Sequence, residues 1–178
     1  MTLLARVAAI LEALQVPYSL IGAAALAVHG IPRSTSDHDL FVTDTACLDR
    51  RTWEGLASEG IHVEVHRGDF QDPLAGVVRF SVTGEIPVDV VIGKLIWQRT
   101  LLERTHGAIF AGTEFPVIGP ADLILLKLYA GGLQDAWDIQ QLLEGPDRES
   151  LIAEVESRLP DLSKEAHSLW RRLLGSDA

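Results

Sequence analysis

Short apolar segments constrain the fold of this chain more than any other feature of its sequence. They recur between residues 18 and 92, and each is long enough for a strand but too short for a typical helix. Turn residues or helical patterns separate them. The sequence therefore predicts an α/β (α+β) fold with one mixed β-sheet flanked by helices. The predicted strands cover residues 18–22, 38–42, 61–66, 76–82 and 86–92.

Helical patterns occupy most of the remaining chain. Apolar residues recur at helical spacing from residue 3 to residue 14, and Pro120 stands at a favoured first position of a later helix. We expect an α/β core over residues 1–118 and a helical C-terminal region over residues 119–178 packed on it. Other helices are predicted over residues 23–30, 48–58, 93–105 and 134–143, two more follow residue 148, and a short strand covers 114–117.

Composition narrows the class of protein. The chain has 178 residues, a formal net charge of −10 and a single cysteine, Cys47, which cannot form an internal disulfide. No apolar run approaches the roughly 20 residues of a membrane span, and the N-terminal segment is interrupted by charge, so we expect a cytoplasmic protein with no membrane partner. The acidic balance argues against an extended nucleic-acid contact, because phosphate binding needs a basic surface.

Two aspartates, Asp37 and Asp39, lie where a polar loop becomes an apolar strand in RSTSDHDLFV. Residues i and i+2 of a strand point to the same face, so these carboxylates project together and His38 points away. Like charges this close repel unless a metal ion, a basic side chain or water lies between them. Paired carboxylates are natural ligands for a hard divalent cation such as Mg²⁺.

A third acid, Asp89, is the only charge in the apolar segment IPVDVVIG. Such a charge is costly inside a strand unless it is paired, bound to a metal or exposed at the strand end. Three acids on neighbouring strands can hold two metal ions roughly 3.5–4 Å apart, the arrangement that supports in-line phosphoryl or nucleotidyl transfer.

Gly22 ends one predicted strand and begins a predicted helix. Backbone N–H groups at a helix N-terminus can face a triphosphate, and the alanines at positions 23–25 leave little bulk to block its approach. A strand-glycine-helix junction is weak evidence alone, but here it precedes the acid pair and the third acid in order.

The stretch IGAAALAVHGIPRSTSDHDLFV, followed by VDVV, resembles the minimal nucleotidyltransferases of the DNA-polymerase-β-like superfamily. In that superfamily a Gly-Gly or Gly-Ser turn precedes a D-x-D pair, and a third Asp follows on a later strand. The H-G-x-x-R-x-T lead-in and KLYAGGLQDAWDIQQL resemble the bacterial branch that includes abortive-infection and toxin-type members. The resemblance covers roughly the first two thirds of the chain.

The resemblance implies a role for each of these residues. Gly22 with Ala23 lines the triphosphate, Asp37 and Asp39 bind Mg²⁺ (or Mn²⁺), and Asp89 binds the catalytic metal and helps to deprotonate the attacking hydroxyl. Ala23 departs from the pattern because it replaces the Gly or Ser of the turn. A hydroxyl donor to the phosphate is therefore missing, and backbone donors remain.

Two basic residues have two interpretations each. Arg33 either meets a phosphate or holds its loop against a carboxylate. Lys127 lies on an apolar helical segment and needs an exposed stripe or a partner. It either forms a helix-helix ion pair with Asp135 and Asp138 or, as the resemblance implies, reaches the β- and γ-phosphates of a nucleotide.

The main hypothesis is an Mg²⁺-dependent nucleotidyltransferase that moves NMP from an NTP to a hydroxyl. The acceptor stays open between a tRNA end, a protein hydroxyl and a small molecule, and a toxin-antitoxin role with an antitoxin partner accompanies the resemblance. The alternative is a weak or inactive protein of this fold that binds nucleotide or another protein. A metal phosphohydrolase of the HD type, built on His29, His38 and Asp39, is disfavoured because its ligands belong on helices.

Overall fold

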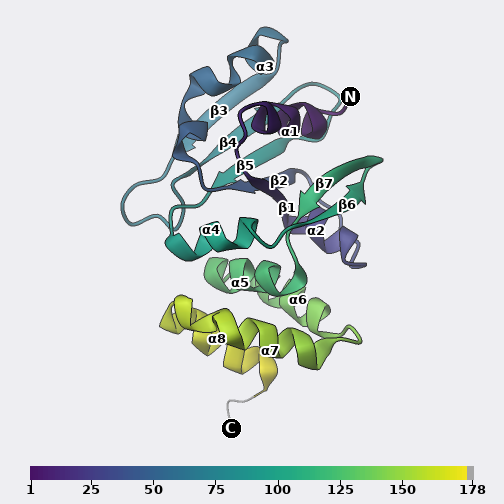
Figure 1. Ribbon diagram of the computed structural model, residues 1–178, viewed down its shortest axis with the longest axis vertical. Coiled ribbons are helices and arrows are strands. Elements are labelled where there is room, and N and C mark those ends of the chain that lie inside the picture. Colours follow the sequence, from purple (N-terminus) through teal and green to yellow (C-terminus); the bar gives the residue numbers. More distant parts are fainter. Residues whose placement is uncertain (176–178) are drawn as a thin grey trace. The chain divides into compact units, whose positions relative to one another are not determined.

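The computed structural model describes residues 1–175, and the chain divides into two compact units. The first unit contains residues 1–28 and 32–118, and the second contains residues 29–31 and the chain from residue 119 onward. Figure 1 labels the helices and strands of both units. The fold is mixed α/β, and the predicted fold class is confirmed.

A mixed sheet forms the centre of the first unit. β2 and β5 are parallel, as are β1 and β7, whereas the other neighbouring strands are antiparallel. Among the described residues the sheet has seven strands in the order β3-β4-β5-β2-β1-β7-β6 (Figure 1). These are β1 (Tyr18–Ile21), β2 (His38–Val42), β3 (His62–Arg67), β4 (Gly76–Ser81), β5 (Val88–Ile92), β6 (His106–Phe110) and β7 (Thr113–Val117).

Short helices flank this sheet, and the first of them is fixed at its N-terminus by a distant acid. Glu85, in the turn between β4 and β5, accepts a hydrogen bond from the backbone N–H of Leu3 and lies 2.7 Å from Arg6 Nη2. This helix, α1, lies against β5 (Figure 1). The helices of the unit are α1 (Leu3–Ala13), α2 (Gly22–Val28), α3 (Glu54–Ser58) and α4 (Ile96–Leu102).

The structure differs from the sequence prediction between residues 45 and 58. Two 3₁₀ turns, Thr45–Leu48 and Arg50–Trp53, precede α3, so the helix predicted over residues 48–58 is an α-helix only over Glu54–Ser58. Asp44 and Asp49 explain the difference, because each side chain accepts a hydrogen bond from a backbone N–H two residues later. Such local bonds compete with continuous helix.

Strand β6 was also not predicted. It pairs with β7 through a tight turn in which Ala111 and Gly112 both have positive φ, at 48° and 80°. Two such residues are typical of a two-residue hairpin turn. Most of the side chains of β6 are exposed or only half-buried, so the apolar pattern that marks the other strands is missing here.

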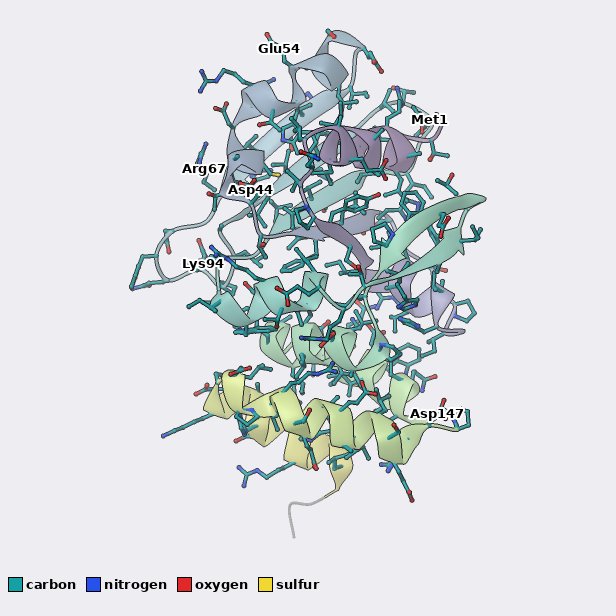
Figure 2. The ribbon with its side chains drawn as sticks, in the orientation of Figure 1. Met1, Asp44, Glu54, Arg67, Lys94 and Asp147 are labelled. Carbon is teal, nitrogen blue, oxygen red and sulfur yellow. The ribbon has the colours of Figure 1, made fainter. Side chains whose placement is uncertain are left out.

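The loop between β3 and β4 is held by side chains on either side of it. Lys94 Nζ donates to the carbonyl oxygens of Asp69 and Phe70 at 3.1 and 3.2 Å, and Arg67 Nη2 donates to the carbonyl oxygen of Leu48 at 2.8 Å. Figure 2 labels both basic residues beside this loop. Lys94 therefore ties this loop to the segment that follows β5.

The second unit is helical. α5 lies against α6, α7 and α8, and its apolar side chains are buried among them. The predicted breaks are confirmed, since Gly131 ends α5 with a φ of 71° and Gly145-Pro146 separates α6 from α7. No helix in residues 1–175 is both long and apolar enough to cross a bilayer. The helices are α5 (Pro120–Ala130), α6 (Leu133–Leu143), α7 (Arg148–Arg158) and α8 (Lys164–Leu174).

Candidate active site

Three neighbouring strands place charged side chains in one row across the sheet. Asp89 of β5 pairs with Arg79 of the antiparallel strand β4 and with Asp39 of the parallel strand β2. Matched positions on neighbouring strands point to the same face, so these three side chains share a face. Val88 and Val90, on either side of Asp89, are fully buried on the opposite face. The core on one face therefore fixes the charged row on the other.

Arg79 is the cation beside these carboxylates. Its Nη2 lies 3.1 Å from Asp37 Oδ2, and its Nη1 lies 3.6 Å from Asp89 Oδ2. One guanidinium thus contacts an acid from the loop before β2 and an acid from β5.

The Asp89 side chain is more buried than that of Asp37. It is 15% exposed, and its Oδ1 is buried without a hydrogen-bond partner in the described part of the chain. Burial raises the pKa of the Asp89 carboxyl, Arg79 opposes that shift, and the negative charge of Asp37 adds to it. The carboxyl is therefore a stronger base than an exposed aspartate, and it has one oxygen available.

Asp37 is positioned by its own loop. The Thr35 hydroxyl donates to the backbone carbonyl oxygen of Asp37 at 2.7 Å and lies 3.3 Å from Asp37 Oδ1. The backbone N–H of His38 then donates to the carbonyl oxygen of Pro87 at 2.9 Å, which begins the pairing of β2 with β5. The loop therefore delivers the Asp37 carboxylate to the start of the strand pair.

Gly22 lies directly against the Asp39 carboxylate. A Cβ atom at this position would come within 2.1 Å of Asp39 Oδ2, and the φ of Gly22 is +62°, a conformation that side chains disfavour. The Asp39 carboxylate consequently lies at the first residue of α2. Ala23, the next residue, is buried.

The donor set fits a hard divalent cation. The Oδ1 of Asp89 is buried without a hydrogen-bond partner in the described residues, and Asp39 lies at the matched position of the neighbouring strand. Carboxylate oxygens are the ligands that Mg²⁺ prefers. Within residues 1–175, however, no three His, Cys, Asp or Glu side chains are already arranged as a metal site. Arg79 occupies the position of the cation between two of the acids.

The structure also places the remaining predicted site residues. Arg33 is half-buried in the loop before β2. Lys127 belongs to the second unit, where its buried Nζ lies 3.2 Å from Asp135 Oδ1 and also pairs with Asp138. These are the partners of the helix-helix interpretation, and a contact of Lys127 with phosphate stays a prediction. His38 packs edge-on against the Phe110 ring, with centroids 5.3 Å apart, in the structural role expected of it.

Sequence reasoning missed Arg79. In GVVRFS it looks like an ordinary solvent-facing residue of an alternating strand. A signal was nevertheless present, because Arg79 and Asp89 are equally far from Gly84, which has a φ of +86° in the turn of the predicted hairpin. A hairpin centred on that glycine places the two residues opposite each other.

Solved structures share this fold. The solution structure of the antibiotic-resistance factor ANT(2'')-Ia superposes with a TM-score of 0.53 and 13% identity, covering 88% of this chain and 91% of that one. A crystal structure of ANT(2'')-Ia with adenylyl-2''-tobramycin superposes with a TM-score of 0.57 and 11% sequence identity, and the match covers 89% of this chain and 95% of that one. The lincomycin-bound lincosamide antibiotic adenylyltransferase LnuA superposes with a TM-score of 0.51 and 16% sequence identity, and the match covers 78% of this chain and 93% of that one.

No protein-family model matches the sequence, and neither does any curated protein. Identities this low show the fold alone. The chain has the fold of these nucleotidyltransferase structures, which is the fold that the resemblance implied.

Proposed function

We propose that the protein is a divalent-metal-dependent nucleotidyltransferase that transfers NMP from an NTP to a hydroxyl acceptor. The observation that carries this proposal is the row of charged residues, in which Asp39 and Asp89 share one face of the sheet beside Gly22 at the start of α2. The fold shared with adenylyltransferase structures supports the same class of reaction.

The chain's own residues have distinct roles in this proposal. The Asp89 carboxylate accepts the proton of the acceptor hydroxyl, because burial raises the pKa of this group. Asp37, Asp39 and Asp89 hold Mg²⁺ or Mn²⁺. When bound, the metal aligns the α-phosphate and neutralises charge on the leaving group.

The reaction is balanced by one bond made and one broken. The acceptor oxygen attacks the α-phosphorus, its proton passes to Asp89, and the bond to the bridging oxygen breaks to release pyrophosphate. Backbone N–H groups at Gly22 and Ala23 are proposed to face the triphosphate, together with Arg33 and Lys127 as further phosphate contacts. Ala23 has no hydroxyl, so its contribution is through the backbone.

The acceptor is proposed as a hydroxyl-bearing small molecule. The net charge of −10 disfavours an extended RNA, and the structural neighbours include ANT(2'')-Ia in complex with adenylyl-2''-tobramycin. The experiment below tests a tRNA end and a protein hydroxyl as acceptors beside such small molecules. The toxin-type branch of the resemblance adds a cytoplasmic toxin role with an antitoxin partner, which predicts growth arrest on expression of the wild type but not of the Asp89→Asn variant.

The test measures transfer of labelled NMP from α-labelled NTPs to these acceptors in the presence of Mg²⁺ or Mn²⁺. We expect turnover by the wild type and a loss of at least about a hundredfold in the Asp39→Asn and Asp89→Asn variants. Asp44→Asn is the matched control, since Asp44 is exposed and only caps a local turn. Equal activity in all four proteins would contradict the proposal.

A second candidate function is a nucleotide-binding protein without turnover. The contacts of Arg79 with Asp37 and Asp89 favour it, because they neutralise acids that the reaction needs, and Ala23 favours it as well. Calorimetry that detects NTP binding without pyrophosphate release would select this candidate. Metal-dependent turnover would eliminate it.

A further inference from the structure

Arg79 stands where a metal ion would compete with it. Its two terminal nitrogens contact different carboxylates, Asp37 at 3.1 Å and Asp89 at 3.6 Å. A planar guanidinium can bridge two acids in this way, whereas an ammonium group presents one compact charge.

The bridge joins two elements that are far apart in the sequence. Asp37 belongs to the loop before β2, and Asp89 lies inside β5 opposite Arg79 itself. Without a cation at this place, two carboxylates would face each other beside Asp39, and their repulsion would oppose the packing of the loop on the sheet. Arg79 therefore stabilises the site when no metal is bound.

The contacts leave the acids partly available. Arg79 reaches Oδ2 of each carboxylate, whereas Oδ1 of Asp89 is buried without a hydrogen-bond partner in the described residues. The Arg79 side chain is 41% exposed, so it can move toward solvent without crossing the core. A divalent cation that takes up Asp89 Oδ1 would lie close to the guanidinium and be repelled by it.

We propose that Arg79 is an internal counter-ion that competes with the divalent metal for Asp37 and Asp89 and so lowers the metal affinity of the site in the absence of nucleotide. The inference rests on the proposed function, because it assumes that these acids bind the metal. Arg79 is a positioning residue here, and it regulates when the site takes up its cation. Metal uptake then coincides with arrival of the nucleotide, whose phosphates supply further ligands.

The test measures binding of Mn²⁺ to the protein without nucleotide, by calorimetry and by electron paramagnetic resonance of the free ion. We expect Arg79→Gln to bind Mn²⁺ about tenfold more tightly than the wild type, which is the effect of removing one charge about 6 Å from a divalent ion in a waterlike dielectric. The gain should disappear in the Arg79→Gln/Asp89→Asn double variant. Arg99→Gln, an exposed arginine of α4 in the same unit, controls for the change in net charge.

Thermal unfolding gives a readout that is independent of metal binding and of activity. Without metal, Arg79→Gln should melt below the wild type, and Mn²⁺ should raise its melting temperature by more than it raises that of the wild type. Arg79→Lys keeps one charge but cannot bridge both acids, so its Mn²⁺ affinity should lie between the two. This variant also serves if Arg79→Gln does not fold.

The outcomes separate the two proposals. Equal or weaker Mn²⁺ binding by Arg79→Gln and Arg79→Lys, with normal metal-dependent turnover by the wild type, would overturn the counter-ion role alone. Absence of Mn²⁺ binding in every variant, with or without NTP, would overturn the counter-ion role and the proposed function together.

Discussion

Gly22 is the residue whose replacement has the most direct structural consequence. Two features disfavour a side chain at this position. The φ of Gly22 is +62°, and an added Cβ would lie 2.1 Å from Asp39 Oδ2. The left-handed conformation alone costs about 1–2 kcal/mol for a residue with a side chain. The short contact would in addition displace the Asp39 carboxylate, which the proposed reaction needs.

We therefore predict that Gly22→Ala loses both stability and activity, with an activity loss comparable to that of Asp39→Asn. Gly60→Ala is the matched control, because Gly60 has a similar φ of +84° but open space around its Cα. It should lose stability only. Chemical denaturation and turnover of the two variants check the prediction, and an active Gly22→Ala would refute it.

Asp89 links stability to pH in a direction set by its burial. Its pKa is raised in the folded protein, so folding stability from this group is fully present below the ordinary carboxyl pKa and is lost as the pH rises through the raised value. Above that raised pKa the ionised carboxylate therefore weakens the fold, as functional groups often do.

This sign predicts that Asp89→Asn melts at a higher temperature than the wild type at pH 7. The difference should shrink as the pH falls toward about 4, near the ordinary carboxyl pKa, because the wild-type group then becomes neutral too. Melting curves of both proteins across this range measure it, with Asp44→Asn as the exposed control. A variant less stable than the wild type at pH 7 would show that the pair with Arg79 outweighs burial.

At the scale of elements, the ion pair between α5 and α6 determines how the second unit packs. Lys127 and Asp138 are both buried, with side chains 8% and 0% exposed. Removing one partner of such a pair leaves an uncompensated charge and costs about 3–5 kcal/mol, whereas replacing both with apolar residues is often neutral.

Lys127→Met should accordingly lose about 3–5 kcal/mol of unfolding free energy. The Lys127→Met/Asp138→Leu double variant should recover most of it, and urea unfolding measures both values. The double variant also tests the phosphate role of Lys127. If it folds but binds NTP poorly, Lys127 contacts the nucleotide; if its NTP affinity is unchanged, Lys127 acts through the ion pair alone.

The elements themselves were largely predictable because their signals are local. Alternation or continuous apolar character marked five strands, and Pro120 and Gly131 marked the ends of α5. Strand β6 escaped because its side chains are mostly outside the core and therefore carry no such pattern. The first part of the helix predicted over residues 48–58 is instead a 3₁₀ turn, because the Asp49 side chain accepts a backbone hydrogen bond that competes with continuous helix.

The site was predictable only in part for a different physical reason. Asp37, Asp39 and Asp89 stand out because a charge is unusual at the end of or inside an apolar strand. Arg79 does not stand out, since arginine is ordinary at an outward position of a strand. Its partnership depends on the register between β4 and β5, a long-range property that residue types alone do not express.

At the scale of the whole molecule, charge limits the choice of acceptor. A net charge of −10 repels a polyanion, and the basic residues form no stripe along the sequence. We predict that labelled duplex RNA binds more weakly than about 10⁻⁴ M at physiological salt, the weak limit typical of non-specific binding. Fluorescence anisotropy measures this affinity. Salt-sensitive micromolar binding would favour RNA over a small molecule as the acceptor.

The row formed by Arg79, Asp89 and Asp39 also has an evolutionary consequence. Arg79 and Asp89 each lie between two fully buried apolar residues of their strands, and Asp39 is followed by the fully buried Leu40. Inserting or deleting one residue inside β4, β5 or β2 would exchange the two faces beyond that point, moving charges inward and core side chains outward. An extra residue in the turn around Gly84 can instead be absorbed as a longer loop. We therefore expect descendants of this chain to tolerate a change of length in that turn better than in these three strands, provided that Glu85 keeps its contacts with Leu3 and Arg6.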